Sequence, residues 1–320
     1  MRRPTFPAMG TPDAEERFRR TFRRAHADHP PCLADEWLME PCRRADGRAV
    51  DRPLVWSRRN GPWRRHDVLW VGAAPGNAGG MGSGTMGAHG TRIPFGGDVA
   101  GANLDALLAG AGLDRNQTYI VAALNRLPER GGGEPKVAEL REPVGGLASS
   151  VHLLRETVLA AAPRLVVALG NVAIRTTVAA LRLDDEPRLT LPGLRRLEAA
   201  GLERGRAVAW PTAFRPDRAF AREWAIVTDG DPLPHLLRLM HPSAQNMSPY
   251  AGPDTAFHTR MVETMAALRA AVPDVLDRSV PPADARPAPP TDGIYALPEW
   301  TEAIGPRHAE LDRLWREKGI

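Results

Sequence analysis

Three short segments of this chain carry residue types that could bind and act on a polar ring or a phosphate. Residues 72–76 (GAAPG) and 94–98 (PFGGD) combine glycines with one aromatic ring and one carboxylate, and residues 241–246 (HPSAQN) begin with a histidine. Glycine lets the backbone approach a ligand closely. A histidine can supply the hydrogen-bond donor that stabilises a developing negative charge. The three segments are therefore candidate parts of one site.

The elements that must position these segments alternate between strand and helix. Strands are predicted at 68–71, 118–124, 165–169, 207–210 and 236–240, and helices at 102–112, 144–162, 172–181 and 254–271. This alternation predicts a largely parallel sheet covered on both faces. Ligands of such sheets bind outside the carboxyl ends of the strands. We interpret the long glycine-rich loop that follows the first strand as the wall and floor of a nucleobase pocket.

Composition sets wider limits on the class of protein. The chain has 320 residues, of which 43% are hydrophobic and 25% charged, as in soluble globular proteins. The N-terminus has no apolar core of a secretory signal and no run approaches a membrane span, so we expect a cytoplasmic, nucleoid-associated protein. The two cysteines, Cys32 and Cys42, provide neither a disulfide framework nor a four-thiolate metal site.

Sequence patterning divides the chain into four parts: a basic N-terminal extension (1–65), an α/β domain (66–272), a proline-rich linker (273–290) and a C-terminal segment (291–320). Arginines of the extension either follow a phosphate backbone or cover a helix packed on the core. The C-terminal segment contains Trp300 and Trp315, and either docks as a helix or binds a partner. A net charge of +4 is a weak indication of an anionic partner.

In their order and spacing, the loop motifs resemble the uracil-DNA glycosylase superfamily, and within it the thermostable B-type branch, also called family five. The resemblance covers about residues 66–272 and rests on residues 72–76, 88–90 (AHG), 94–98 and 241–246. It implies a parallel four-stranded sheet flanked by helices. It also implies that a target base leaves the DNA stack and enters a narrow pocket.

The resemblance also assigns roles to residues. It implies that His241 donates a hydrogen bond to O2 of the departing uracil anion and that the ring of Phe95 stacks on the base. Gln245, Asn246 and Met247 are candidates to fill the gap left in the duplex. Base contacts are expected from Ala74, Phe95 and Asn125, and DNA contacts from Gly76, Ser243, Gln245 and Asn246.

The chain departs from the family pattern in two places. Related branches have an acidic or amide residue at the second or third position of the first motif to position the attacking water, where this chain has Ala73 and Ala74. Asn77 and Asp98 are the candidates for that catalytic role, although a cap at the start of a helix accounts for Asp98 equally well. Many A- and B-type relatives also bind a four-cysteine iron–sulfur cluster, for which this chain lacks the cysteines.

The sequence thus predicts a three-layer α/β fold with a mainly parallel four-stranded sheet, and a monofunctional DNA glycosylase for uracil or a related deaminated base. We expect DNA as partner, no cofactor, no metal, no membrane and a monomer. Two alternatives stay open. One is a member of the same fold that binds nucleic acid without catalysis. The other is an unrelated nucleotide-binding protein that uses the glycine loop. Separately, Phe95 could be a core residue and His241 a structural cap at a strand end.

Overall fold

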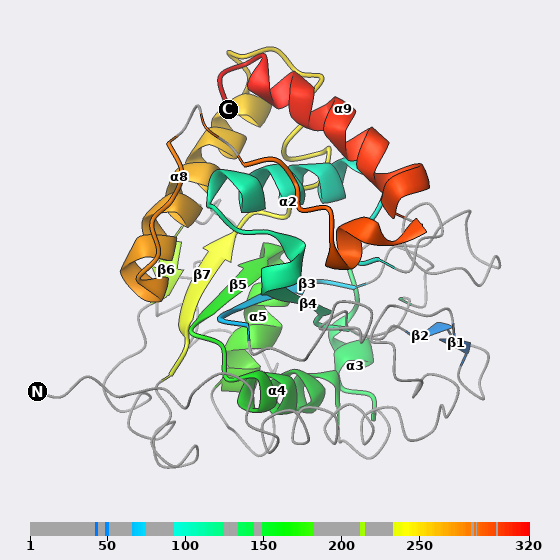
Figure 1. Cartoon of the computed structure of the whole chain (residues 1–320). Coiled ribbons are helices and arrows are strands. Elements are labelled where there is room, and N and C mark those ends of the chain that lie inside the picture. Colours follow the sequence, from blue (N-terminus) through cyan, green and yellow to red (C-terminus); the bar gives the residue numbers. More distant parts are fainter. Residues whose placement is uncertain are drawn as a thin grey trace, which may run out of the picture.

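The computed structural model describes residues 42–43, 49–50, 66–74, 93–124, 128, 134–143, 149–181, 212–214, 233–282, 285, 287–298 and 300–320. Its centre is a five-stranded sheet in the order β4-β3-β5-β7-β6 (Figure 1). The four parallel strands are β3 (Val68–Gly72), β4 (Thr118–Ala122), β5 (Leu165–Leu169) and β7 (His235–Leu239). Antiparallel β6 (Thr212–Phe214) pairs with β7, and β1 (Cys42–Arg43) pairs separately with β2 (Ala49–Val50).

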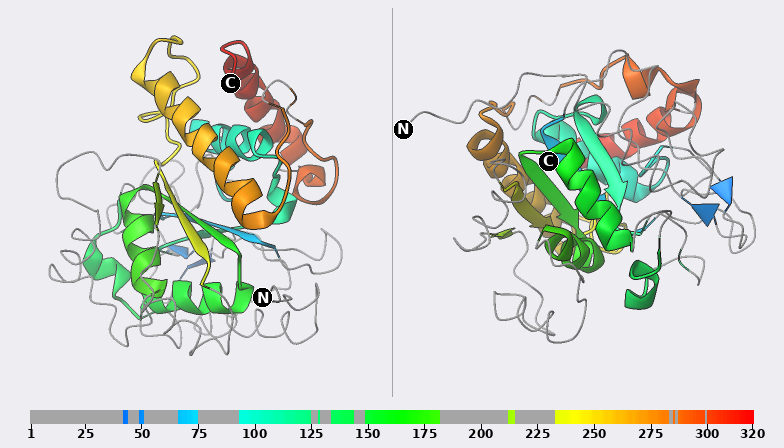
Figure 2. Two further views of the ribbon diagram at one scale, coloured as in Figure 1. Left: turned by 90° about the vertical axis from the view of Figure 1, so that its left-hand side faces the viewer. Right: turned by 90° about the horizontal axis from the view of Figure 1, so that it is seen from below.

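Helices cover both faces of the sheet, which gives three layers (Figure 2). One face packs against α4 (Ser150–Ala161) and α5 (Gly170–Leu181), and the other against α2 (Val99–Gly110), α8 (Ala256–Leu276) and α9 (Gly305–Arg316). In β3, Leu69 and Val71 face the first layer, whereas Val68 and Trp70 face the second. Both sides of the strand are buried, which explains its continuous apolar run.

The predicted three-layer fold with four parallel strands is confirmed, with one short antiparallel edge strand added. The strand predicted at 165–169 is β5, and the other parallel strands differ from prediction by one or two residues at an end. The helix predicted at 254–271 instead runs to Leu276 and includes Pro273, so the first residues of the predicted linker are helical. The strand predicted at 207–210 and the arginine-rich part of the N-terminal extension lie outside the described residues.

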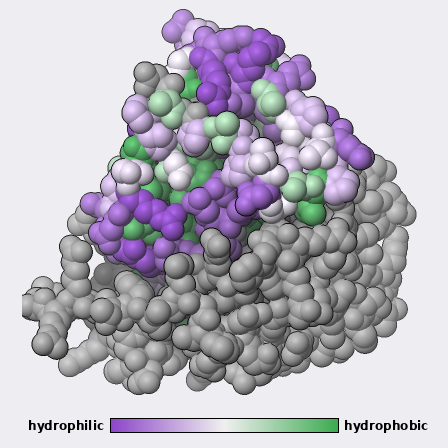
Figure 3. Space-filling view, in the orientation of Figure 1, coloured by the Kyte–Doolittle hydropathy of each residue, from purple (hydrophilic) through white to green (hydrophobic). Residues whose placement is uncertain are grey.

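The C-terminal segment docks onto the domain, and this answers the question that the sequence left open. The short turns η5 (Gly293–Ala296) and η6 (Trp300–Ile304) lead into α9, which packs along α2 (Figure 1). Leu311 and Trp315 of α9 are buried in the core. The described surface at the top of Figure 3 is mainly hydrophilic, as expected when the apolar side of α9 faces inward. Among the described helices, none is long and apolar enough to cross a membrane.

Two further segments complete the described elements. The short helix α3 (Val137–Leu140) precedes α4, and the 3₁₀ turn η4 (Arg115–Gln117) leads from α2 into β4. The helix predicted at 144–162 begins at Ser150, where the side chain of Ser149 accepts a hydrogen bond from the backbone N–H of His152. Serine is a preferred residue at this position because its oxygen satisfies a free N–H of the first turn.

Candidate active site

The candidate site lies at the carboxyl edge of the parallel strands. After β3 the chain forms β4 on one side, and then returns to place β5 on the other side of β3. The loops after β3 and β5 therefore leave in opposite directions, and this switch point is where α/β sheets bind ligands. Gly72 ends β3 and Gly170 follows β5. The sequence alone could not show that these two strands are neighbours.

Residues of all three predicted loop segments meet at this edge, the first segment through Gly72. The rings of Phe95 and His241 lie with their centroids 5.7 Å apart and their planes tilted by 34°. A Cβ atom on Gly72 would lie 3.1 Å from the ring of Phe95, and one on Gly170 would lie 3.3 Å from Cβ of His241. The small residues at the strand ends thus leave room for the two rings. The fold brings Phe95 and His241 together from residues that are far apart in the sequence.

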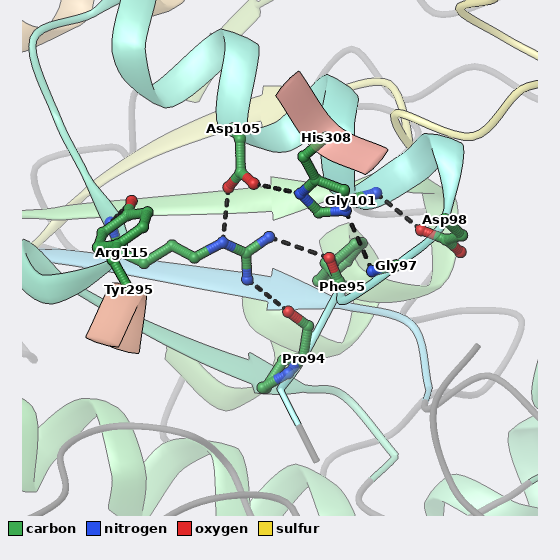
Figure 4. Close-up of polar contacts among 9 residues, drawn as sticks. All are labelled: Pro94, Phe95, Gly97, Asp98, Gly101, Asp105, Arg115, Tyr295 and His308. Carbon is green, nitrogen blue, oxygen red and sulfur yellow. Dashed lines mark hydrogen bonds and ion pairs between the residues drawn. The ribbon is translucent and has the colours of Figure 1, made fainter. Parts of the chain in front are cut away.

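Phe95 has a strained backbone and a rigid support. Its φ of 55° lies in the left-handed region, which is uncommon for residues other than glycine. The guanidinium of Arg115 donates hydrogen bonds to the carbonyl oxygens of Pro94, at 2.6 Å, and of Phe95, at 3.0 Å (Figure 4). Strained residues of this kind persist where the surrounding structure fixes them, and they cluster at functional sites. The half-buried ring of Phe95 is therefore held in one place.

Arg115 is itself fixed by an ion pair with the partly buried Asp105. Its Nε lies 2.6 Å from Oδ1 of Asp105, and the arginine side chain has no exposed surface. The other carboxylate oxygen of Asp105 lies 2.5 Å from Nδ1 of His308, on α9. Burial by itself would raise the pKa of Asp105. The charge of Arg115 and the hydrogen bonds from His308 and Arg115 outweigh this effect, so the pKa lies below its usual value.

The electrostatics of His241 favour a neutral imidazole. Burial lowers the pKa of His241 below its usual value, because the charged form loses its hydration. The negative charge of Asp98 opposes this effect only in part. A neutral histidine carries one N–H group, so it can donate one hydrogen bond to a ligand without bringing a positive charge into the site.

Asp98 serves as the N-cap of α2. Its Oδ1 accepts a hydrogen bond of 2.8 Å from the backbone N–H of Gly101. The helix begins at Val99, three residues before the predicted start at 102. Asn103 and Asp105 therefore lie in the interior of the helix, beyond its first turn. The interpretation of Asp98 as a cap agrees with this geometry.

Hydrogen bonds inside the third loop hold the backbone of His241. The side chain of Asn246 donates to the carbonyl oxygen of His241 at 2.9 Å and to Oγ of Ser243 at 3.3 Å. Gln245 is exposed and Ser243 is partly buried. Met247 is fully buried in the core, so the expectation that it enters a duplex is wrong. Of the residues proposed to fill a gap in DNA, Gln245 is exposed and Asn246 is partly buried.

The remaining candidates are less well placed. Ala74, two residues beyond β3, is partly buried against the core on the α4 and α5 side of the sheet. Gly76, Asn77 and Asn125 lie outside the described residues, as do the loop residues 88–90. The described part of the chain contains no cluster of three or more His, Cys, Asp or Glu side chains suited to a metal.

The residues behind the loops, which hold them in place, were not among those predicted from the sequence. Asn103 is fully buried, and its amide donates to the carbonyl oxygens of Pro242, at 2.7 Å, and Met247, at 2.6 Å. Polar residues 103 and 105 interrupt an otherwise alanine- and leucine-rich helix, which was a visible signal of buried polar contacts. Their partners are distant in sequence, so the pattern could not identify them.

The described structure also contains a cavity of about 410 Å³ away from the paired rings of Phe95 and His241. It lies between α2, α9 and the proline-rich residues 287–290, and Asp105 and His308 form part of its lining. Neither ring lines it. The position of the candidate site therefore rests on the sheet topology and the paired rings, and not on the size of this cavity.

Together, the parallel sheet, the switch point and the paired Phe95 and His241 define a three-layer α/β protein with a ligand site at the carboxyl edge. The chain belongs to the uracil DNA glycosylase superfamily, whose family model matches residues 60–266. This membership supports an activity of the DNA glycosylase type, with DNA as the substrate. No curated protein matches the chain significantly.

Proposed function

We propose that this protein is a monofunctional DNA glycosylase of the B-type branch that removes uracil, or another deaminated base, from DNA and leaves an abasic site for base excision repair. The observation that carries the proposal is the pairing of Phe95 with a half-buried His241 at the switch point of the sheet, where loss of hydration lowers the pKa of the imidazole. An aromatic face and a hydrogen-bond donor are the two groups that a flipped base requires. We further propose that it acts as a monomer in the cytoplasm, at the nucleoid.

In the proposed reaction, the ring of Phe95 stacks on the extruded base and His241 faces its O2 atom. The bond between N1 of the base and C1′ of the sugar breaks, and its electron pair leaves with the base as an anion. The N–H of His241 stabilises the charge that develops on O2. A water molecule adds to C1′ and gives up one proton, and the departing base anion takes up one proton. The hydrolysis of one glycosidic bond thus yields free base and an abasic sugar.

Asp98 and Asn77 are the candidates for positioning the water, and matched substitutions separate them. Asp98→Asn keeps the helix cap, since asparagine and aspartate cap about equally well, but removes the carboxylate. Loss of base release without loss of stability would assign the role to Asp98. Unchanged release would assign Asp98 to the cap alone, and Asn77→Ala would then be expected to abolish release.

A hydrolytic reaction without a covalent intermediate is proposed because neither lysine of the chain is placed as a nucleophile. Lys136 lies at the start of α3. Lys318 donates a hydrogen bond to the carbonyl oxygen of Pro249, and its ammonium lies 5.4 Å from the ring centre of Trp315. Borohydride treatment during turnover should therefore trap no protein–DNA adduct. A trapped adduct would show lyase chemistry and contradict this part of the proposal.

The direct test is base release from end-labelled oligonucleotides that carry uracil, hypoxanthine or xanthine, in single- and double-stranded form, followed by alkali. We expect cleavage at the modified base that is lost in His241→Ala. His235→Ala is the matched control, because His235 is exposed at the opposite end of β7. Absence of cleavage on every substrate, or equal loss in both variants, would contradict the proposal.

The alternative function is DNA binding without catalysis. The observation that favours it is the pair Ala73 and Ala74 at the end of β3, where related branches carry a polar residue for the water. In that case the protein should bind DNA with an affinity that falls steeply as salt rises, because phosphate contacts release counterions. Binding of this kind without base release on any substrate would favour the alternative.

A further inference from the structure

Helix α9 reaches both loops of the candidate site from outside the part of the chain that defines the family. The family match ends at residue 266, whereas α9 begins at Gly305. The helix nevertheless packs along α2, directly behind the loop that carries Phe95 (Figures 1 and 4). Its buried side chains include His308, which is 4% exposed, and Trp315, which is fully buried.

The first connection runs through His308 to the Phe95 loop. Nε2 of His308 accepts a hydrogen bond of 3.0 Å from the backbone N–H of Gly97. Because a backbone N–H can only donate, Nε2 is the unprotonated nitrogen and Nδ1 carries the hydrogen that points to Asp105. Asp105 also binds Arg115, which holds the carbonyl oxygen of Phe95. His308 thus contacts the loop directly at Gly97 and indirectly through this ion pair.

The second connection runs through Trp315 to the His241 loop. The indole N–H of Trp315 donates to Oδ1 of Asn103 at 2.7 Å. This bond fixes the amide orientation, because the indole nitrogen can only donate. The NH₂ group of Asn103 is thereby directed to the carbonyl oxygens of Pro242 and Met247, at either end of the turn that follows His241. One helix therefore sets the positions of both loops.

We propose that α9 is a built-in positioning element of the site, with His308 as the residue that positions the Phe95 loop and Trp315 as the residue that positions the His241 loop. The effect of this positioning on base release rests on the proposed function. The physical reason is that the bond from Gly97 to His308 and the bonds of Asn103 to Trp315 and the His241 loop are buried, so water does not compete for their donors or acceptors. Small displacements of the groups that contact a substrate can then lower the rate strongly.

A pair of substitutions at His308 separates positioning from packing. In His308→Gln, the amide oxygen can take the place of Nε2 and accept from Gly97, but the bond to Asp105 is lost. In His308→Asn, the amide NH₂ can take the place of Nδ1 and donate to Asp105, but the acceptor for Gly97 is lost. Both substitutions change the size or shape of the side chain. A loss of activity caused by altered packing alone would therefore scale with the loss of stability in both variants.

The experiment measures amide hydrogen exchange at residues 94–98 and base release in the full-length protein. We expect exchange at Gly97 to rise roughly fivefold in His308→Asn and to stay near wild type in His308→Gln, as fits the loss of one hydrogen bond. The turnover number should fall about 10–100-fold in His308→Asn with little change in KM, and His308→Gln should restore most of it. His235→Gln, at an exposed position, is the control.

The outcomes distinguish this inference from the proposed function. Equal exchange at Gly97 in both variants, or losses of activity that follow thermal stability alone, would overturn the positioning role. If wild type releases no base but the exchange pattern holds, the proposed function fails and the structural role of His308 stands. Trp315→Phe gives a second readout, with increased exchange expected at residues 242–247 because Asn103 loses the group that orients it.

Discussion

Replacement of Gly101 by alanine tests how closely the Phe95 loop is packed on α2. Glycine in a helix costs up to about 1 kcal/mol relative to alanine, so helix propensity alone predicts that the substitution in the first turn of α2 stabilises the protein. The structure predicts the opposite. A Cβ atom at this position would overlap the carbonyl oxygen of Phe95 and lie 2.7 Å from its carbonyl carbon and 2.9 Å from Cε1 of His308, whereas Cβ contacts under 3.0 Å are essentially never observed.

The backbone of Phe95 cannot move away freely. Arg115 holds its carbonyl oxygen at 3.0 Å, and Arg115 is locked by Asp105. Overpacking of this kind typically costs about 1–3 kcal/mol, which exceeds the gain in helix propensity. Because the added atom would overlap a fixed carbonyl oxygen, we take the upper part of this range, about 2–3 kcal/mol, and expect the free energy of unfolding to fall by about 1–2 kcal/mol after the gain of about 1 kcal/mol in helix propensity. A displacement of the loop on the order of 1 Å would lower the rate of base release by about 100-fold.

Gly110→Ala provides the matched control on the same helix. Its Cβ atom would meet the sulfur and terminal methyl of Met265, which can rotate away, instead of a fixed backbone. We expect its stability and its base release to stay near those of the wild type. Urea unfolding and single-turnover base release measure both quantities. A Gly101→Ala protein that is as stable and as active as Gly110→Ala would refute the inferred packing of the Phe95 loop.

Three further predictions concern charged and titrating groups. Arg115→Met should lower the free energy of unfolding by about 2–3 kcal/mol at pH 7, because Asp105 then keeps only the hydrogen bond from His308. The pKa of Asp105 is lowered in the folded state, so the stability that this carboxylate contributes is present above its ordinary pKa of 3.8 and disappears as pH falls through the folded value. The free energies of unfolding of wild type and Arg115→Met, measured in urea, should therefore converge in acid. Asp98→Ala should cost about 1 kcal/mol in the same assay and Asp98→Asn only a few tenths, and equal losses would contradict the capping role. An NMR titration should place the pKa of His241 below 6.5 and move it lower in Asp98→Asn. The stability contributed by the neutral imidazole is complete above pH 6.5 and declines as pH falls through the folded pKa. A titration midpoint at or above 6.5 would contradict the burial of the imidazole.

The sequence by itself determined the layer architecture and the loops that form the site. Continuous apolar runs predicted strands buried on both faces, and the 3.6-residue pattern between them predicted the covering helices. The strand ends then located the glycine- and histidine-containing loops at one edge of the sheet. These features follow from local patterns of apolar residues and turn residues, which is why they were visible without coordinates.

Tertiary structure alone decided which residues hold the site in place. The left-handed conformation of Phe95, its support by Arg115 and the bridge from Trp315 through Asn103 to the His241 loop connect segments separated by up to 212 residues. No local pattern specifies such partners, because a buried polar side chain shows only that it needs a hydrogen bond and not where its partner comes from. The docking of α9 was undecided for the same reason, since an amphipathic helix indicates that it buries one face but not the surface that receives it.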